Sequence, residues 1–277
     1  NEKIREEGYV THLINEHAVQ FIEENREQPF CLYVAHEAPH FPYQGPDDEA
    51  IRQEGNPNRE DRDPERVRRA YREMVEVMDE GVGQILDTLE RLNLSENTFL
   101  LFCSDNGALS FGSNGDLRGW KGSVWEGGHR VPAIAWWPGQ VEVGSTTGAL
   151  TICLDVKPTI AELIGQPLSP DYAIDGQSLL PVLTEQQTNK NRWLFWEYEG
   201  QEAVRHGQWK LVRNVKDAVG DRPRLGVGLY NLEEDPAETN NLAEKQPERA
   251  QSMIKALGEW YQEVYENMSV QPMNDSD

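Results

Sequence analysis

The sequence is poor in cysteine and has no long hydrophobic run. Its three cysteines, Cys31, Cys103 and Cys153, lie in apolar stretches and form no C-x-x-C motif, so neither a zinc site built on that motif nor a dithiol redox centre is predicted. We expect all three to be buried free thiols. The longest apolar runs, residues 99–103 and 131–137, are much shorter than the ~20 residues that cross a bilayer. No membrane span is therefore expected.

Basic residues are also scarce. The chain has 26 Lys and Arg against 48 Asp and Glu, which gives a net charge of −22. Nucleic acids and anionic membrane surfaces are bound through basic patches, so neither is an expected partner. A small anionic substrate is not excluded, because a few cations in one cleft outweigh a distant field that salt screens. The 38% hydrophobic and 27% charged residues are typical of a folded globular protein.

Hydrophobic periodicity predicts an α/β architecture for the first part of the chain. Residues 29–35 form a short apolar run, which predicts a buried strand. Between residues 64 and 92, apolar side chains recur every three or four positions, the pattern of a long amphipathic helix. Residues 97–103 and 131–136 predict two further strands. Strand, helix and strand in this order are typical of a parallel sheet covered by helices.

The pattern changes near residue 191. Residues 193–198, 203–212 and 228–232 alternate apolar and polar side chains, which predicts a small antiparallel sheet, and an amphipathic helix follows them. We therefore expect two domains, an α/β domain at residues 1–190 and a smaller antiparallel subdomain at residues 191–277.

The loops that follow the predicted strands carry polar residues that can bind ligands or take part in catalysis. Open α/β sheets bind ligands beyond the carboxyl ends of their strands, so these loops are expected to meet at one edge. The residues concerned are His36, His40, Asp105 and Asn106, and, in the glycine-rich connection, Arg118, Lys121, His129 and Arg130.

Asp105 and Asn106 are candidate metal ligands. A carboxylate and an amide carbonyl are hard oxygen donors that suit calcium or magnesium. Two ligands do not complete such a site. The alternative is structural, since Asp-Asn-Gly at residues 105–107 also favours a turn after a strand.

Lys121 and His40 are candidate anion-binding residues. Lys121 lies between Gly119 and Gly122, where a compact ammonium group can project from a closely packed backbone toward a tetrahedral oxyanion. It can equally be a solvated surface lysine. His40 is flanked by prolines that stiffen its loop, which suits either an aimed imidazole or a structural histidine.

Three blocks of the sequence resemble the type I sulfatase family in order and spacing. They are PFCLYVAHEAPHFP at residues 29–42, SDNG at residues 104–107, and LRGWKGSVWEGGHRVP at residues 117–132, which continues into AWWPG at residues 135–139. Residues 229–243 also resemble the carboxy-terminal subdomain of that family. The resemblance covers nearly the whole chain.

This resemblance implies an alkaline-phosphatase-like α/β/α sandwich and calcium-dependent hydrolysis of sulfate esters, with magnesium a less favoured ion. The family's nucleophile is a formylglycine made from the Cys or Ser of a C/S-x-P-S-R motif. Neither form of that motif occurs in this sequence. We therefore expect the nucleophile upstream of this chain, and we expect the chain alone to be inactive.

The family's site residues carry over to four positions. Asp105 and Asn106 match a pair of calcium ligands, Lys121 matches a sulfate-contacting lysine, and His40 matches the histidine near the leaving oxygen. Arg118 is a further candidate for substrate binding. His36 does not match that position and is expected to be structural.

The third block resembles N-acetylgalactosamine-6-sulfatase-like and arylsulfatase-like members more than it resembles choline sulfatases, which implies a sulfated sugar or an aryl sulfate as substrate. Two alternatives stay open. One is a phosphodiesterase or phosphonate monoester hydrolase on the same scaffold, and the other is an inactive homologue that binds glycans. We expect a periplasmic or secreted protein, and the sequence leaves the oligomeric state open.

Overall fold

The structure is a computed structural model. It describes residues 5–50, 63–109, 111–166, 168–169, 174–215 and 225–266. The chain falls into two compact units, one made of Asn1–Leu100 with Ala135–Gly139 and the other of Leu101–Ile134 with Gln140–Asp277. The predicted domain boundary at residue 190 lies inside the second unit and stays a prediction.

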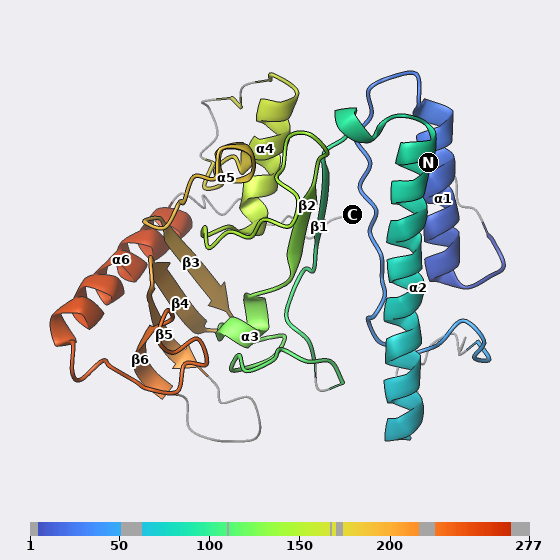
Figure 1. Cartoon of the computed structure of the whole chain (residues 1–277). Coiled ribbons are helices and arrows are strands. Elements are labelled where there is room, and N and C mark those ends of the chain that lie inside the picture. Colours follow the sequence, from blue (N-terminus) through green and yellow to red (C-terminus); the bar gives the residue numbers. More distant parts are fainter. Residues whose placement is uncertain are drawn as a thin grey trace, which may run out of the picture. The chain divides into compact units, whose positions relative to one another are not determined.

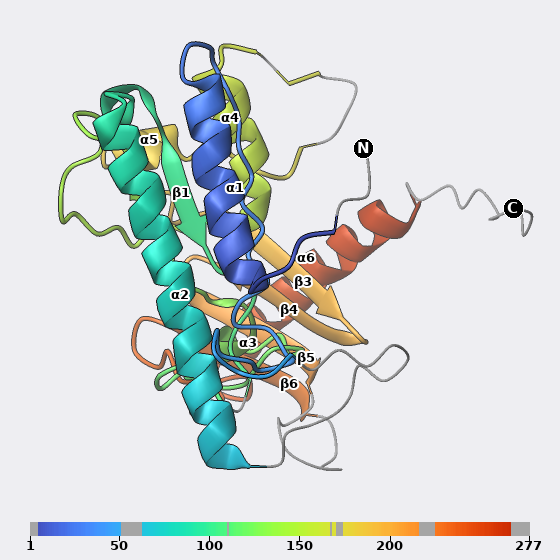
Figure 2. The same ribbon diagram turned by 90° about the vertical axis from the view of Figure 1, so that its right-hand side faces the viewer.

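Two helices dominate the first unit. Helices α1 (Val10–Asn25) and α2 (Pro64–Arg91) lie side by side (Figures 1 and 2). Helix α2 begins where the side chain of Asp63 accepts a hydrogen bond from the backbone of Glu65, and it matches the predicted helix. Helix α1 was not predicted, because its buried stripe includes the polar Thr11 and Asn15 and so lacks the apolar period that marks a helix in sequence.

The predicted strand at residues 29–35 is wrong, since the segment has no regular secondary structure. Phe30, Leu32 and Val34 pack against the core of the two helices, whereas Tyr33 is 89% exposed. A strand needs a hydrogen-bonded neighbour, and among the described residues no backbone hydrogen bond joins this segment to another. The apolar run predicted a buried strand, but the described chain covers one side of the segment.

The predicted burial of the cysteines is wrong for a similar reason. Cys31, Cys103 and Cys153 are all exposed free thiols. Each lies in an apolar run of the sequence, yet the described residues leave the side chain of each uncovered. Apolar neighbours along the chain therefore did not guarantee burial.

Strands β1 (Leu100–Cys103) and β2 (Ala133–Trp136) form a two-stranded sheet. Both were predicted, with longer bounds. Strand β1 starts late because Ser95–Asn97 form a 3₁₀ helix. Just outside the strands, the backbone N–H of Ser104 donates to the carbonyl of Pro132 at 3.2 Å, so the loop after β1 begins beside the entry to β2.

An antiparallel sheet and a helix form the carboxy-terminal part of the second unit, as predicted. Strands β3 (Trp193–Tyr198), β4 (Gln201–His206), β5 (Trp209–Val215) and β6 (Leu225–Asn231) are hydrogen-bonded in the order β3-β4-β5-β6. The single strand predicted at residues 203–212 is two strands, because the chain turns at Gly207, where φ is +61°.

Each face of this sheet has its own core. Helix α6 (Pro247–Glu266) covers one face (Figure 1), where Leu257 and Met253 pack on Leu211. On the other face, Val124 and Trp125 pack against residues of the sheet. Because those two residues belong to the glycine-rich connection, the sheet supports the segment that carries Lys121.

The remaining described helices are α3 (Glu126–His129), α4 (Val156–Leu163), α5 (Leu180–Thr184) and the 3₁₀ helix Cys153–Asp155. Asp155 is fully buried, and its carboxylate lies 2.7 Å from the guanidinium of Arg192. In the part of the chain that the structure describes, no helix is long and apolar enough to cross a membrane.

Candidate functional site

The loop after β1 and the turn that carries Lys121 are joined by backbone hydrogen bonds. The N–H of Lys121 donates to the carbonyl of Ala108 at 3.2 Å, and the N–H of Gly107 donates to the carbonyl of Gly128 at 2.9 Å. The side chain of Asn114 spans the two, since it accepts from the N–H of Ala108 and donates to the carbonyl of Gly119. The structure thus brings the loop of Asp105 and Asn106 together with the turn of Lys121.

Glycine is required where these segments meet. A Cβ atom at Gly107 would lie 1.8 Å from the carbonyl oxygen of Gly127, far inside contact distance. Gly119 has a φ of +85° and its Cβ would also clash with Trp125, so any side chain there would meet both strain and contact. The glycine-rich composition therefore has a local cause, the close approach of two backbone segments.

Asp105 and Asn106 lie together at the end of β1. The amide nitrogen of Asn106 donates to the carboxylate of Asp105 at 2.5 Å, and the hydroxyl of Ser104 donates to the backbone carbonyl of Asn106. Asp105 is exposed, so its second oxygen is open to a ligand. As hard oxygen donors this pair fits a calcium ion. Within the described ranges no group of three acidic, histidine or cysteine ligands occurs, so the pair would supply part of such a site.

Lys121 and Arg118 differ in their surroundings. Lys121 is half-buried, and its side chain forms no ion pair with the residues that the structure describes. The guanidinium of Arg118, in contrast, lies 3.8 Å from the ring centre of Trp125 and donates to the carbonyl of Glu238 at 3.0 Å. Arg118 is thus held against the sheet of the second unit, and its role in substrate binding stays a prediction.

His40 is in the first unit, on an exposed loop. Its Nδ1 lies 2.7 Å from the carbonyl oxygen of Phe41. A carbonyl only accepts, so Nδ1 carries the proton and Nε2 is the atom left to meet a ligand. Because His40 and Lys121 belong to different compact units, their convergence on one sulfate stays a prediction.

His36 is held by the helices of the first unit. Its Nε2 donates to the amide oxygen of Asn15 at 2.7 Å, and the amide nitrogen of Asn15 donates to the carbonyl of Val77 on α2. Burial lowers the pKa of His36 and favours the neutral ring. These contacts fit the structural role expected from the sequence.

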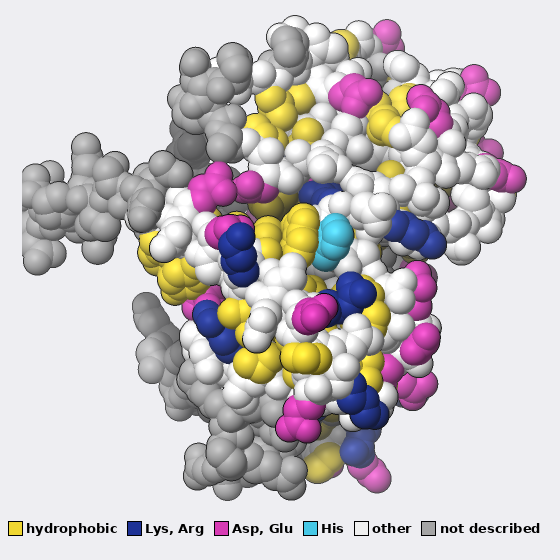
Figure 3. All heavy atoms as spheres, turned by 90° about the vertical axis from the view of Figure 1, so that its left-hand side faces the viewer, with side chains coloured by type: hydrophobic (Ala, Val, Ile, Leu, Met, Phe, Trp, Pro, Cys, Tyr) yellow, Lys and Arg dark blue, Asp and Glu magenta, His cyan; other side chains and the backbone are white. Residues whose placement is uncertain are grey.

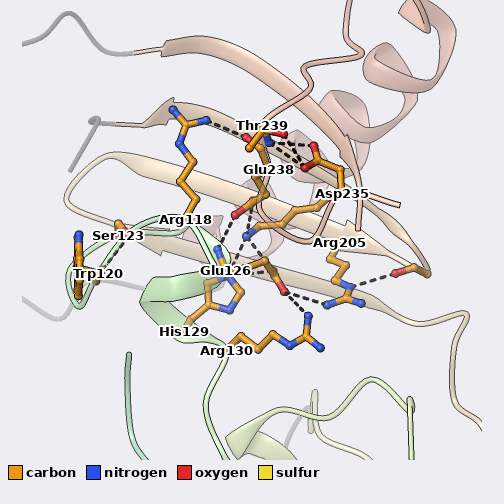
Figure 4. A network of polar contacts seen from close by, with 12 residues as sticks. Arg118, Trp120, Ser123, Glu126, His129, Arg130, Arg205, Asp235, Glu238 and Thr239 are labelled. Atoms are coloured by element: carbon orange, nitrogen blue, oxygen red, sulfur yellow. Dashed lines mark hydrogen bonds and ion pairs between the residues drawn. The ribbon is translucent and has the colours of Figure 1, made fainter. Parts of the chain in front are cut away.

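A buried charge cluster links Glu126, which follows the turn of Lys121, to the antiparallel sheet and the loop after it (Figure 4). The sequence did not predict this cluster. Its members Glu126, Lys210 and Glu238 are all fully buried. The ammonium of Lys210 lies 2.9 Å from one oxygen of each carboxylate. Arg205 and Arg130 approach the other oxygen of Glu126, at 3.4 and 3.7 Å.

The two carboxylates of the cluster differ in pKa. Burial acts to raise the pKa of Glu126, but nearby cations, led by Lys210, outweigh it and lower that pKa from 4.5 to about 2. Burial raises the pKa of Glu238, although Lys210 opposes it. Glu126 is therefore the carboxylate that is firmly charged at neutral pH.

His129 belongs to this cluster. Its ring stacks on Trp196 with 4.4 Å between centroids, and its Nε2 lies 3.1 Å from the ammonium of Lys210. Burial, assisted by Lys210, lowers the pKa of His129 from 6.5 to about 3. His129 is thus a neutral acceptor inside the fold, which distinguishes it from the exposed His40.

Comparisons with known proteins identify the family of the chain. The family model described as Sulfatase matches residues 1–166, and the model described as N-sulphoglucosamine sulphohydrolase, C-terminal, matches residues 119–266. Arylsulfatase G of Rattus norvegicus is 32% identical over 92% of this chain and 52% of its own length. N-acetylgalactosamine-6-sulfatase of Mus musculus is 35% identical over 74% of this chain and 38% of its own length.

Solved structures give the fold. The crystal structure of Ps i-CgsB in complex with k-i-k-neocarrahexaose has a TM-score of 0.77 and 29% identity, and it covers 94% of this chain and 56% of that one. BT4656 in complex with D-Glucosamine-2-N, 6-O-disulfate has a TM-score of 0.69 at 20% identity over 99% of this chain and 73% of that one. The α/β, alkaline-phosphatase-like fold class predicted from the sequence is thereby confirmed.

The chain spans about half, or less, of the length of these curated relatives. A family model covers more than half of this chain, and arylsulfatase G resembles nearly all of it. The chain belongs to the sulfatase family.

Proposed function

We propose that this chain is the carboxy-terminal part of a calcium-dependent sulfatase that hydrolyses sulfate esters of a sugar, with a formylglycine nucleophile supplied from outside this chain. The observation that carries the proposal is the loop cluster in which Asp105 and Asn106 are tied to the turn of Lys121. Oxygen donors for a cation, and a lysine that forms no ion pair with the described residues, then serve the same sulfate group. Relatives named for sulfated sugars support the substrate class.

Asp105 and Asn106 would hold the calcium ion, which when bound polarises the sulfate and stabilises its negative charge. Lys121 would bind the sulfate oxygens through its ammonium group and stabilise the charge that develops there in the transition state. This charge is needed whichever alcohol departs.

His40 would act at the leaving oxygen. Because its Nδ1 proton is held by the carbonyl of Phe41, Nε2 is the atom that meets the ester. When the ring is protonated, Nε2 donates a proton to the departing alcohol as a general acid. Poor leaving groups depend on that proton, and activated aryl leaving groups do not.

The test uses the full-length protein and two substrates, a sugar sulfate and an activated aryl sulfate. Lys121→Ala should lower kcat on both by about 10²- to 10³-fold. His40→Ala should lower kcat much more on the sugar sulfate. His17→Ala and Lys157→Ala, which remove exposed side chains from α1 and α4, serve as controls and should keep the wild-type rates.

The outcomes separate the proposed roles. Equal losses on both substrates in His40→Ala would reject the acid role, and a wild-type rate in Lys121→Ala would reject the sulfate-binding role. Hydrolysis of a phosphodiester or phosphonate monoester in preference to both sulfates would favour the hydrolase alternative. Binding of sulfated glycan without turnover would favour the inactive homologue.

We also propose that the protein is exported, to the periplasm or outside the cell, where sulfated glycans are met. Fractionation of cells that express the full-length gene tests this. Recovery of the protein in the cytosolic fraction alone would contradict it.

A further inference from the structure

Glu238 occupies an unusual place in the second unit. It lies between β6 and α6, its side chain is fully buried, and its backbone φ is +54°, in the left-handed region. Residues other than glycine rarely adopt that conformation, and where they do the surrounding structure holds them there. Here Asp235 holds the turn, because its carboxylate accepts from the backbone N–H groups of Thr239 and Asn240.

Three groups of the chain converge on Glu238 (Figure 4). One carboxylate oxygen accepts from the backbone N–H of Glu126 at 2.7 Å. The other lies 2.9 Å from the ammonium of Lys210. The backbone carbonyl accepts from the guanidinium of Arg118 at 3.0 Å. One residue therefore contacts both Arg118 and Glu126.

Residues 118 and 126 are the two ends of the turn that carries Lys121. The turn is closed by the N–H of Gly127, which donates to the carbonyl of Arg118 at 2.7 Å. A lysine ammonium on a flexible stem has many positions open to it, so the place from which it acts is set by the backbone of its turn. Holding both ends of the turn restricts that backbone.

We propose that Glu238 is a positioning residue for Lys121: it clasps the two ends of the turn and so aims the ammonium at the sulfate. This inference rests on the proposed function of Lys121. Lys210 supports this role of Glu238, because the ammonium of Lys210 stabilises the buried carboxylate of Glu238. The antiparallel sheet and the loop that follows it then contribute to substrate binding by positioning Lys121.

The test is a double-mutant cycle in the full-length protein, read as kcat on a sulfate ester and as the inhibition constant for inorganic sulfate. Glu238→Gln keeps the volume and one acceptor oxygen but removes the charge that faces Lys210. Glu238→Ala removes the side-chain contacts with Glu126 and Lys210 and leaves the backbone carbonyl that accepts from Arg118. We expect a fall in kcat of about tenfold for Glu238→Gln and up to about a hundredfold for Glu238→Ala, the scale of loss when a reacting group is misplaced by about 1 Å.

The cycle separates positioning from general destabilisation. If Glu238 acts through Lys121, either substitution should change kcat and sulfate inhibition little in a Lys121→Ala background, since no ammonium is left to aim. Losses of the same factor in both backgrounds would overturn the proposal, as would wild-type kcat in Glu238→Gln. Glu234→Gln, an exposed residue near the same turn, is the matched control and should behave as wild type.

Folding and function are checked separately. Urea unfolding should show that Glu238→Gln is folded at the assay temperature, and Glu238→Gln then carries the test if Glu238→Ala is not. If Lys121→Ala itself keeps wild-type kcat, the proposed function of Lys121 fails. If Lys121→Ala is impaired and the cycle is additive, only the positioning role of Glu238 fails.

Discussion

Replacing Lys210 with methionine should cost the protein much of its stability at neutral pH. The substitution keeps the approximate shape of the side chain and removes the ammonium that lies 2.9 Å from both Glu126 and Glu238. Removing one partner of a buried ion pair typically costs about 3–5 kcal/mol. The pKa of Glu126 gives a similar figure, since its fall from 4.5 to about 2 corresponds to about 3 kcal/mol of stabilising interaction. We therefore expect a loss of about 3–5 kcal/mol in Lys210→Met.

The loss should depend on pH with a defined sign. In the wild type the folded pKa of Glu126 is below its unfolded value, so its contribution is complete above pH 4.5 and is lost as the pH falls toward 2. In Lys210→Met the two carboxylates keep their burial without the ammonium, so the folded pKa of Glu126 should rise above its unfolded value, and that of Glu238, already raised by burial, should rise further. Protonation of these carboxylates then removes buried charge, so the variant is destabilised less as the pH falls from 7 toward 5. The difference in free energy of unfolding between the two proteins should shrink over that range.

Urea unfolding at pH 7, 6 and 5 measures this difference. Lys255→Met is the control, because Lys255 pairs with Glu259 at 3.5 Å on the exposed face of α6, and such surface pairs contribute less than about 1 kcal/mol. The double variant Glu126→Gln with Lys210→Met should recover part of the loss, since it no longer buries the charge of Glu126. A loss below about 1 kcal/mol, or a loss that stays constant from pH 7 to 5, would refute the reasoning.

Three further substitutions test the core, the glycine contact and the metal pair. Leu257→Ala, in the core between α6 and the sheet, should lower the free energy of unfolding by about 2–5 kcal/mol, and a value near that of the more exposed Val264→Ala would contradict the packing. Gly107→Ala places a Cβ 1.8 Å from the carbonyl of Gly127 and should lower the free energy of unfolding. Gly258→Ala on α6, with no atom within 4 Å, should raise it by up to about 1 kcal/mol. Equal urea midpoints for the two variants would disprove the close contact. In the full-length protein, Asp105→Ala should reduce the bound calcium measured by atomic emission more than Asn106→Ala does, because it removes a charged ligand. Full calcium content in Asp105→Ala would exclude Asp105 as a ligand. Asp116→Ala, at an exposed position, is the control.

The elements that sequence predicted well are those whose burial follows a complete apolar pattern. Helices α2 and α6 each bury a regular stripe, and strands β1 and β2 follow apolar runs. Helix α1 was missed because Thr11 and Asn15 occupy its buried face. The strand at residues 29–35 was overpredicted because an apolar run reports a tendency to be covered, whereas a strand also needs a hydrogen-bonded neighbour.

For the site, the sequence indicated candidate residues but not the contacts between the loops that carry them. The loop of Asp105 and the turn of Lys121 were both expected beyond strand ends, and the hydrogen bonds of Gly107 and Ala108 that unite them have no mark in the sequence. The charge cluster was invisible for another reason. Lys210 is 84 positions from Glu126, and a buried charge looks the same as a surface charge until its partners are known. Its one local sign is a lysine inside the apolar strand β5.

The charge cluster also bears on the proposed binding of an anionic substrate by a strongly acidic protein. The net charge of −22 is spread over the molecule, and on the face shown in Figure 3 acidic and basic side chains are interspersed. Salt limits the reach of exposed charges to about 8 Å, so the groups nearest the turn decide the local potential. There Glu126 and Glu238 are turned inward and paired with Lys210 and its neighbours.

The charges of Glu126 and Glu238 are thereby compensated inside the second unit. Both are fully buried, and both are paired with backbone N–H groups or cations of the second unit. The same contacts thus fix the ends of the turn and compensate the charges of Glu126 and Glu238. For the proposed role of Lys121 this compensation matters, because an unpaired carboxylate within reach of that lysine would compete with the sulfate for the same charge.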